Sequence, residues 1–184
     1  MTNRKSFLAM LFSLVLLAPA TPAGEFADDL TWDKDPKHRT AHAALEGKPM
    51  PALDLSEWIN GEVKSTDTKG KVLVVDFYAT WCGPCMKAIP HNNEMYKKYK
   101  DQGLVLIGVC TSGSGQEKFA ANAKEKGIEY PAARDAKLKT EKAWAAQYYP
   151  TYALVDRKGI VRVIGLQPQN VEAAVKKLLA EPAP

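Results

Sequence analysis

Two of the three cysteines, Cys82 and Cys85, stand two residues apart within the stretch DFYATWCGPCMKAIP, residues 76–90. A pair at this spacing can serve as a structural disulfide, as half of a metal site, or as a redox centre that alternates between dithiol and disulfide. A structural disulfide across so short a loop adds little stability, because the stabilisation grows with loop length. A zinc site needs four ligands, and the sequence otherwise offers only Cys110 and three scattered histidines. The spacing therefore favours a redox dithiol, and we expect no metal and no cofactor.

The residues around the pair indicate different roles for the two thiols. Cys82 follows a predicted strand and stands where a helix begins, so its sulfur faces unpaired backbone N–H groups and the positive end of the helix dipole. Both favour the thiolate, which makes Cys82 the expected nucleophile. Cys85 comes one turn later and can reach back to close the disulfide. We expect Gly83 to allow a tight turn and Pro84 to preset the first helical turn.

The elements expected to position this pair alternate between strand and helix. Apolar stretches rich in β-branched residues predict buried strands, and amphipathic stretches between them predict helices. Asn60–Gly61, between two short apolar segments, predicts an N-terminal β-hairpin extension. This order predicts an α/β fold with a central mixed β-sheet and helices on both faces. The strands are expected at 71–79, 103–110, 151–156 and 160–165, and the helices at 86–100, 115–127 and 170–181.

The N-terminal residues predict a secretory signal peptide. A basic start is followed by an apolar run over 7–17 and then by small residues and prolines, which is the order of an export signal. The run is shorter than the roughly 20 apolar residues of a membrane span, although an uncleaved membrane anchor is the alternative interpretation. We expect a signal peptide over 1–23, an extension over 24–46 and one globular domain over 47–184. The mature protein is then periplasmic or secreted, where disulfides persist.

The overall charge gives no reason to expect a charged macromolecule as a partner. The formal net charge is +4, and it is near +2 once Arg4 and Lys5 are removed with the signal peptide. We therefore expect no nucleic-acid partner and no anionic membrane surface, and we expect a monomer.

His38 and His42 in the extension have a helical i, i+4 spacing. No third metal ligand lies nearby in the sequence, so we interpret them as part of a solvated helical face.

The segment VVDFYATWCGPC, with Pro90 five residues after Cys85, resembles the active-site segment of thioredoxins. The order of elements over residues 47–181 is similar to that of the secreted thioredoxin-like thiol-disulfide oxidoreductases of the TlpA and ResA kind. The supporting stretches are GKPMPALDL, KGKVLVVDFYATWC and YPTYALVDRKGIVRVIG. The resemblance implies a thioredoxin fold and an enzyme that reduces protein disulfides with a CxxC pair.

The resemblance also assigns roles in substrate binding. It implies a cis-proline at Pro150, so that Tyr149 and Pro150 face the disulfide and offer backbone groups to an extended substrate polypeptide. It implies that Trp81 shields the sulfurs and, with Gly83 and Pro84, gives the substrate an apolar surface. Tyr149 departs from the small aliphatic residue that thioredoxins commonly carry there, so the substrate preference is not implied.

Asp76 lies six residues before Cys82, where thioredoxins carry a buried carboxyl group. Burial raises the pKa of a carboxyl group, which allows it to exchange protons near neutral pH. We expect Asp76 to help deprotonate Cys85 when Cys85 resolves the mixed disulfide. The resemblance further implies disulfide-containing protein substrates and a membrane-embedded thiol reductant as the electron donor.

Three other interpretations stay open. The Thr80 hydroxyl, two residues before Cys82, is similar to a feature of peroxiredoxins and would suit a thiol peroxidase. A disulfide oxidase or isomerase uses the same pair at a different potential. A redox-inactive binding module, which keeps the fold only to hold a partner, is the third alternative.

Cys110 ends a predicted buried strand, and we interpret it as a small hydrophobic residue rather than a third reactive thiol. We interpret His91 as a surface residue.

Overall fold

The structure is a computed structural model that describes Phe26, Thr31 and residues 35–183. The expected signal peptide over 1–23 lies outside the described residues. A search of the described part of the chain finds no helix with the length and apolar character needed to cross a membrane.

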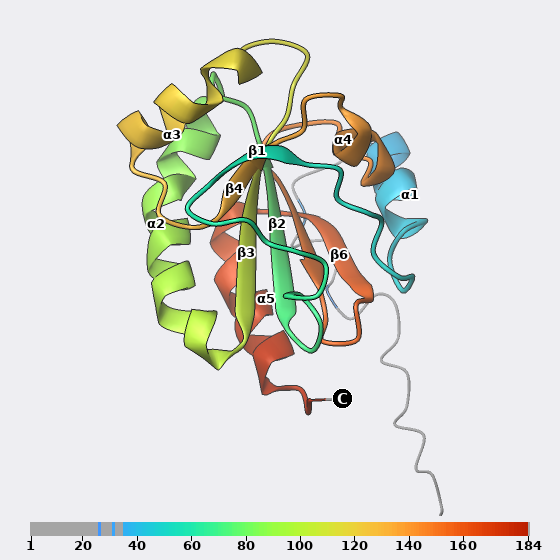
Figure 1. The fold of residues 1–184 in the computed structure, drawn as a ribbon. Coiled ribbons are helices and arrows are strands. Elements are labelled where there is room, and N and C mark those ends of the chain that lie inside the picture. Colours follow the sequence, from blue (N-terminus) through green and yellow to red (C-terminus); the bar gives the residue numbers. More distant parts are fainter. Residues whose placement is uncertain (1–25, 27–30, 32–34, 184) are drawn as a thin grey trace, which may run out of the picture.

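One mixed sheet forms the centre of the molecule (Figure 1), with the strand order β1-β4-β3-β2-β5-β6. β2, β3 and β4 run parallel to one another, whereas β5 is antiparallel to β2, β6 to β5, and β1 to β4. The expected mixed α/β sheet is therefore confirmed. The strands are β1 Ser56–Ile59, β2 Val72–Tyr78, β3 Leu104–Cys110, β4 Ala132–Arg134, β5 Thr151–Val155 and β6 Val161–Leu166.

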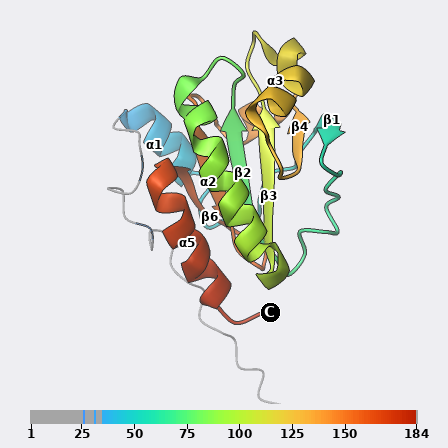
Figure 2. The same ribbon diagram turned by 90° about the vertical axis from the view of Figure 1, so that its left-hand side faces the viewer.

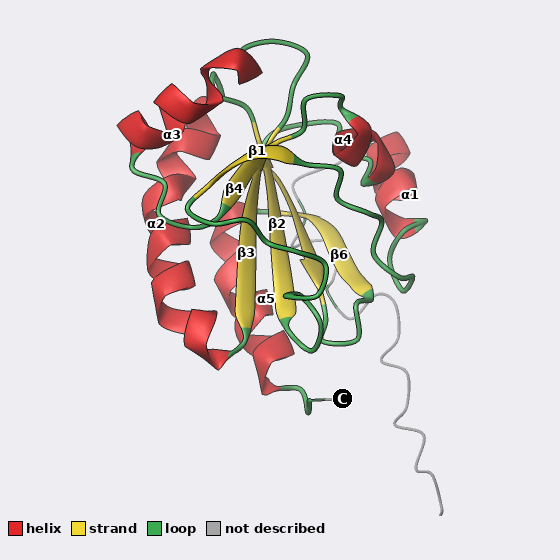
Figure 3. Cartoon of the chain, viewed as in Figure 1, coloured by secondary structure: helices red, strands yellow, loops and turns green. Residues whose placement is uncertain are grey.

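Two apolar layers cover the two faces of the sheet. Helices α2, α3 and α5 contribute to one layer (Figure 2 shows α2 and α5 in front of the sheet). On the other face, Trp144 and Ala146, which follow α4, pack with apolar residues of the chain over 45–63. The loop that follows β1 crosses this second face in front of β2 and β3 (Figure 3). The helices are α1 Pro36–Ala43, α2 Gly83–Tyr99, α3 Phe119–Lys126, α4 Lys139–Ala143 and α5 Pro168–Ala180, with short 3₁₀ turns at Lys100–Gln102 and Gln116–Lys118.

β2 is buried along its whole length because both layers close over it. Since successive side chains of a strand point to opposite faces, Val74 and Tyr78 enter the layer of α2, whereas Val75 and Phe77 enter the other layer. Asp76 alternates with Val74 and Tyr78 and so faces α2. The prediction of a strand covered on both faces is confirmed.

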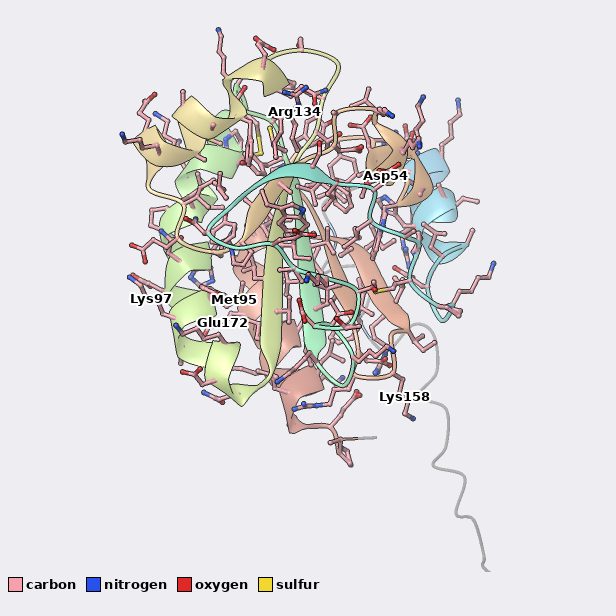
Figure 4. All side chains as sticks on the ribbon, in the orientation of Figure 1. Asp54, Met95, Lys97, Arg134, Lys158 and Glu172 are labelled. Atoms are coloured by element: carbon pink, nitrogen blue, oxygen red, sulfur yellow. A yellow bond between two sulfur atoms is a disulfide. The ribbon has the colours of Figure 1, made fainter. Side chains whose placement is uncertain are left out.

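The amphipathic pattern of α2 presses one side of this helix onto the sheet. Met95 is buried in the layer between α2 and the sheet, whereas Lys97 points outward to solvent (Figure 4). Because α2 begins directly after the loop that leaves β2, this packing fixes the position of the helix N-terminus at the carboxyl end of β2.

The prediction of a β-hairpin around Asn60–Gly61 is wrong, because the segments on its two sides do not pair with each other. Both residues have positive φ (57° and 103°), so the chain does turn there, but residues 61–71 form no strand and β1 pairs with β4 instead. The Asn60 side chain donates hydrogen bonds to the carbonyls of Ile128 (2.7 Å) and Tyr130 (3.1 Å), just before β4. These bonds fasten the end of β1 to the distant strand rather than to the following segment.

Helix α1, within the expected extension, packs beside β6, and the chain after it runs along the outer edge of that strand. The backbone of 47–50 exchanges hydrogen bonds with Gly159 and Val161. His42 is buried rather than solvated as expected, because its Nε2 lies 2.9 Å from the carbonyl oxygen of Ala145, in the turn that follows α4.

Candidate active site

Cys82 and Cys85 form a disulfide at the N-terminus of α2, and both residues are buried. Cys82 is the N-cap residue, and its sulfur accepts a hydrogen bond from the backbone N–H of Cys85 at 3.2 Å. A thiolate on Cys82 would occupy this position at the positive end of a long helix, where its negative charge is favoured. The geometry is therefore that of an activated nucleophile with a resolving partner one turn away.

The two residues between the cysteines are exposed. Pro84 occupies the first turn of α2, as predicted. Gly83 has ordinary helical backbone, and a side chain at this position would meet open space. Neither a positive φ nor a close contact requires glycine at this exposed position, so the role of Gly83 in a tight turn stays a prediction.

The peptide bond between Tyr149 and Pro150 is cis, which confirms the conformation implied by the resemblance. Pro150 is buried, and Thr151 begins β5 opposite Phe77 of β2. The Tyr149 ring meets the Trp81 ring edge to face, with centroids 5.9 Å apart. This contact brings the cis-proline segment to the side of the disulfide.

Trp81 is held in an exposed position by the loop after β3. Its side chain is 61% exposed, more than any other large hydrophobic side chain among the described residues. The indole Nε1 donates to the carbonyl of Ser114 (3.2 Å), and the Thr80 hydroxyl donates to the carbonyl of Gly115 (2.8 Å). These two bonds fix the indole beside the disulfide instead of letting it collapse onto the core.

Two surface grooves reach the residues around the disulfide. One, of about 480 Å³, is lined by Trp81, Ser114 and the first part of α3. The other, of about 440 Å³, runs from Pro84 past His91 to Pro168 at the start of α5. His91 is half-exposed, with its Nε2 3.8 Å from Glu172, so it lines a groove and lies at the surface as predicted.

A carboxylate that the sequence did not single out lies behind Tyr149. The Tyr149 hydroxyl donates to Glu141 Oε2, and the Thr111 hydroxyl donates to the same oxygen at 2.8 Å. Burial, followed by the bond to Glu141, raises the pKa of Tyr149 above its ordinary range. Glu141 in turn is placed by α4, where its backbone N–H donates to Asp135 (2.8 Å). Nothing in the local sequence pairs these residues, because they come from four separate segments.

Asp76 is buried on β2 and has no cation as a partner among the residues that contact it. Asn92 of α2 donates a hydrogen bond to its Oδ2 at 2.9 Å. Burial raises the pKa of Asp76 to about 7, while Tyr130, Asn92 and Tyr152 act in the opposite direction with less effect. This carboxyl group can therefore gain and lose a proton near neutral pH. Asn92 and Tyr152 were not singled out from the sequence.

Cys110 is fully buried in the same apolar layer as the disulfide, opposite Tyr78 on the neighbouring strand. Burial raises the pKa of its thiol to about 12, which disfavours the reactive thiolate. The environment is that of a small hydrophobic residue. Among the described residues, no cluster of three or more histidine, cysteine or acidic side chains has the arrangement of a metal site.

Comparison with known proteins agrees with this geometry. Residues 45–180 match the model of the Redoxin family. The chain belongs to the Redoxin family. The thiol-disulfide oxidoreductase ResA of Bacillus anthracis is 30% identical over 137 residues, which cover 72% of this chain and 78% of ResA. Protein DipZ of Mycobacterium tuberculosis is 38% identical over 132 residues, which are 68% of this chain but only 19% of DipZ.

Solved structures of proteins similar to this Redoxin family member have the same fold. A thioredoxin-like protein in its oxidised form has 30% sequence identity and a TM-score of 0.63, with 72% of this chain and 95% of that chain covered. The thioredoxin domain of a thiol-disulfide oxidoreductase from Bacteroides vulgatus has 25% identity and a TM-score of 0.64, with 73% and 97% covered. The expected membership among the thioredoxin-like thiol-disulfide oxidoreductases is confirmed.

Proposed function

We propose that this Redoxin family member reduces disulfide bonds of other proteins outside the cytoplasm, using Cys82–Cys85 as its redox couple. The observation that carries the proposal is the disulfide itself, which lies at the N-terminus of α2 directly after exposed Trp81, whose ring contacts Tyr149 of the cis peptide bond. The WCGPC sequence and the likeness to ResA support a thiol-disulfide exchange reaction.

The reaction begins with the reduced protein. The Cys82 thiolate attacks one sulfur of the substrate disulfide, forming a mixed disulfide and releasing the other substrate sulfur as a thiolate, which takes up a proton. Cys85 then loses its proton and attacks Cys82, and the second substrate sulfur leaves. Two electrons pass from the protein to the substrate, which ends as a dithiol, and the protein ends with the Cys82–Cys85 disulfide described above.

Residues around the couple take defined parts in this reaction. Asp76 accepts the proton of Cys85 during the second attack, because a carboxyl group with a pKa of about 7 is partly ionised at neutral pH. Tyr149 and Pro150 contact the extended substrate chain through their backbone. Trp81, Gly83 and Pro84 form the exposed surface that the substrate covers.

The location and the electron supply complete the proposal. The basic, apolar and small-residue order of the N-terminal residues supports export, with action in the periplasm or outside the cell. Each cycle leaves the couple oxidised, so a reductant must return two electrons. A membrane-embedded thiol protein that carries reducing equivalents across the bilayer fits this need.

Single-cysteine variants test the proposal through insulin reduction. Cys85→Ser should accumulate a mixed disulfide with insulin, because the nucleophile remains and the resolving thiol is gone. Cys82→Ser should form no such adduct and should lose activity. Cys110→Ser is the matched control and should behave like wild type. Undiminished insulin reduction by both Cys82→Ser and Cys85→Ser would overturn the proposal.

The direction of electron flow is tested separately by redox titration of the couple. A midpoint near about −270 mV supports a reductant, whereas one near about −120 mV indicates an oxidase. The titration follows the mass of the protein after thiol alkylation in glutathione or dithiothreitol buffers, so that it does not depend on a choice of substrate.

A further inference from the structure

Asn92 joins three elements beneath the disulfide. It lies on α2 about two turns after Cys85, on the same side of the helix, and it is buried to 2% exposure. Its Nδ2 donates to Asp76 Oδ2 at 2.9 Å and to the Tyr152 hydroxyl at 3.0 Å. One amide group therefore links the helix that carries both cysteines to β2 and to β5.

The two oxygens of Asp76 have different surroundings. Oδ2 accepts the Asn92 bond, whereas Oδ1 is buried with no hydrogen-bond partner among the described residues. The other polar groups that face Asp76 are Tyr130 before β4, Tyr152 on β5 and Tyr78 on β2. These are hydroxyl groups that stay uncharged near neutral pH, so none of them neutralises the carboxylate.

We propose that Asn92 is a positioning residue for the proton transfer, because its bond to Oδ2 leaves Oδ1 as the oxygen that carries and exchanges the proton. Among the described residues the Asn92 amide is the donor within hydrogen-bond distance of the carboxyl group, so it sets the orientation of that group. This inference rests on the proposed role of Asp76 as the proton acceptor of Cys85.

The second bond of Asn92 extends this arrangement toward the substrate side. Tyr152 pairs directly with Asp76 across β2 and β5, and it stands two residues after Pro150. The amide thus fixes the carboxyl group relative to both the resolving cysteine and the strand that follows the cis-proline. During resolution the proton of the Cys85 thiol passes to Oδ1 while the Cys82–Cys85 bond forms and the substrate sulfur leaves with the bonding electrons.

The experiment measures the pKa of Asp76 in the oxidised protein by ¹³C NMR of the carboxyl carbons, with Asp76→Asn to assign the signal. Asn92→Leu removes the donor to the charged carboxylate at similar side-chain size, so the pKa of Asp76 should rise by about one unit. Tyr152→Phe removes the second partner of the amide and a weaker stabilising hydroxyl near Asp76, so it should give a smaller rise.

Asn93→Leu is the matched control, because Asn93 lies on the same helix but bonds to Gly127 and Glu129 instead. Asn93→Leu should leave the pKa of Asp76 unchanged. A pKa of Asp76 that is the same in Asn92→Leu and wild type, or that rises equally in Asn93→Leu, would overturn the inference. The NMR titration also reports on folding, and Asn92→Ala, which likewise removes the donor to Asp76, supplies the measurement if Asn92→Leu does not fold.

A kinetic measurement separates this inference from the proposed function. A rise of one unit lowers the ionised fraction of Asp76 at pH 7 about fivefold, so resolution of a preformed mixed disulfide should slow about fivefold at pH 7 and recover toward pH 9. If the pKa shifts but the rate does not, Asp76 is not the base and the proposed role fails while the positioning bond stands. If the pKa of Asp76 does not shift in Asn92→Leu, the inference fails, whereas the proposed reduction of disulfides by Cys82–Cys85 still stands.

Discussion

Trp81 and Tyr149 meet at an interplanar angle of 76°, an edge-to-face arrangement that joins the residue before the nucleophile to the residue before the cis-proline. Each ring is also fixed from behind, the indole by Ser114 and the phenol by Glu141. The residue before the nucleophile and the residue before the cis-proline are therefore held in contact before any substrate arrives, which reduces the ordering that binding requires.

We expect the ring of Tyr149, more than its hydroxyl, to support substrate reduction. Tyr149→Ala removes the contact with Trp81 and should lower kcat/KM for insulin reduction by up to about tenfold, which corresponds to the energy of an aromatic pair. Tyr149→Phe keeps the ring contact and loses only the bond to Glu141, so its loss should be smaller. Wild-type kcat/KM in Tyr149→Ala would show that the ring contact does not matter for the reaction.

Gly115 should be required for the position of Trp81. Its φ is +82°, and a Cβ there would lie 2.8 Å from the Thr80 hydroxyl oxygen and 3.0 Å from the indole. Gly115→Ala should cost about 1–2 kcal/mol of stability and change the fluorescence of Trp81. Gly113→Ala is the control, because a side chain at 113 meets open space. Equal fluorescence and unfolding curves for the two variants would contradict the prediction.

The stability of the oxidised protein should depend on pH through Asp76. Its pKa is raised from 3.8 to about 7, so between these pH values the folded protein holds a proton that the unfolded chain has lost. The free energy of unfolding from this group therefore falls as the pH rises from about 4 to 7, and it stays low above pH 7. Asp76→Asn removes this dependence.

In urea unfolding, Asp76→Asn should match wild type near pH 4 and exceed it at pH 8 by an amount on the order of 3–4 kcal/mol. Asp67→Asn serves as the control for an exposed carboxyl group. An advantage of Asp76→Asn that is the same at both pH values would argue against a raised pKa.

Glu46 should anchor the segment after α1 to the sheet. Its side chain is 5% exposed, accepts two bonds from Arg39 and receives the backbone N–H of Ile164 at 3.0 Å. Glu46→Gln removes the charge and should destabilise the fold by about 1–3 kcal/mol. Asp54→Asn, which breaks an exposed pair with Lys139, should leave the unfolding midpoint nearly unchanged. If Glu46→Gln and Asp54→Asn lost comparable free energy of unfolding, the burial of Glu46 would not be the cause of its contribution.

Cys110 should resist alkylation while the protein is folded. Its burial and its pKa of about 12 keep it a neutral thiol at pH 8. Iodoacetamide should therefore modify Cys82 of the reduced protein rapidly and Cys110 only in denaturant, as measured by mass spectrometry of the peptides. Rapid modification of Cys110 in the native oxidised protein would show that this thiol is accessible.

The parts predicted from the sequence are those whose signals are local. The apolar runs of β2, β5 and β6 and the amphipathic pattern of α5 depend on neighbours within a few residues, so the sequence predicts them. β4 and α4 were missed because each is short, with three and five residues, and owes its structure to distant partners. The pairing of β1 was wrong because the Asn60 side chain bonds to a segment far along the chain.

The site divides in the same way. Cys82, Cys85 and Pro84 could be placed from one strand-to-helix junction, and Asp76 could be placed from its resemblance to the buried carboxyl group of thioredoxins. The supporting side chains could not, because Asn92 reaches Asp76 from the next helix and Glu141 reaches Tyr149 through a tertiary contact. A polar residue on a helix is usually exposed to solvent, so the sequence around Asn92 does not indicate that it is buried against the sheet.

The backbone of residues 47–50 pairs with the chain at the start of β6, and the Glu46 side chain binds the N–H of Ile164 further along that strand. At the other end of the sheet, β1 is only four residues long with a positive φ at Glu57. A long, open strand edge is a template on which another extended chain can pair. With one edge partly occupied and the other short and irregular, this sheet offers little such template for lateral pairing.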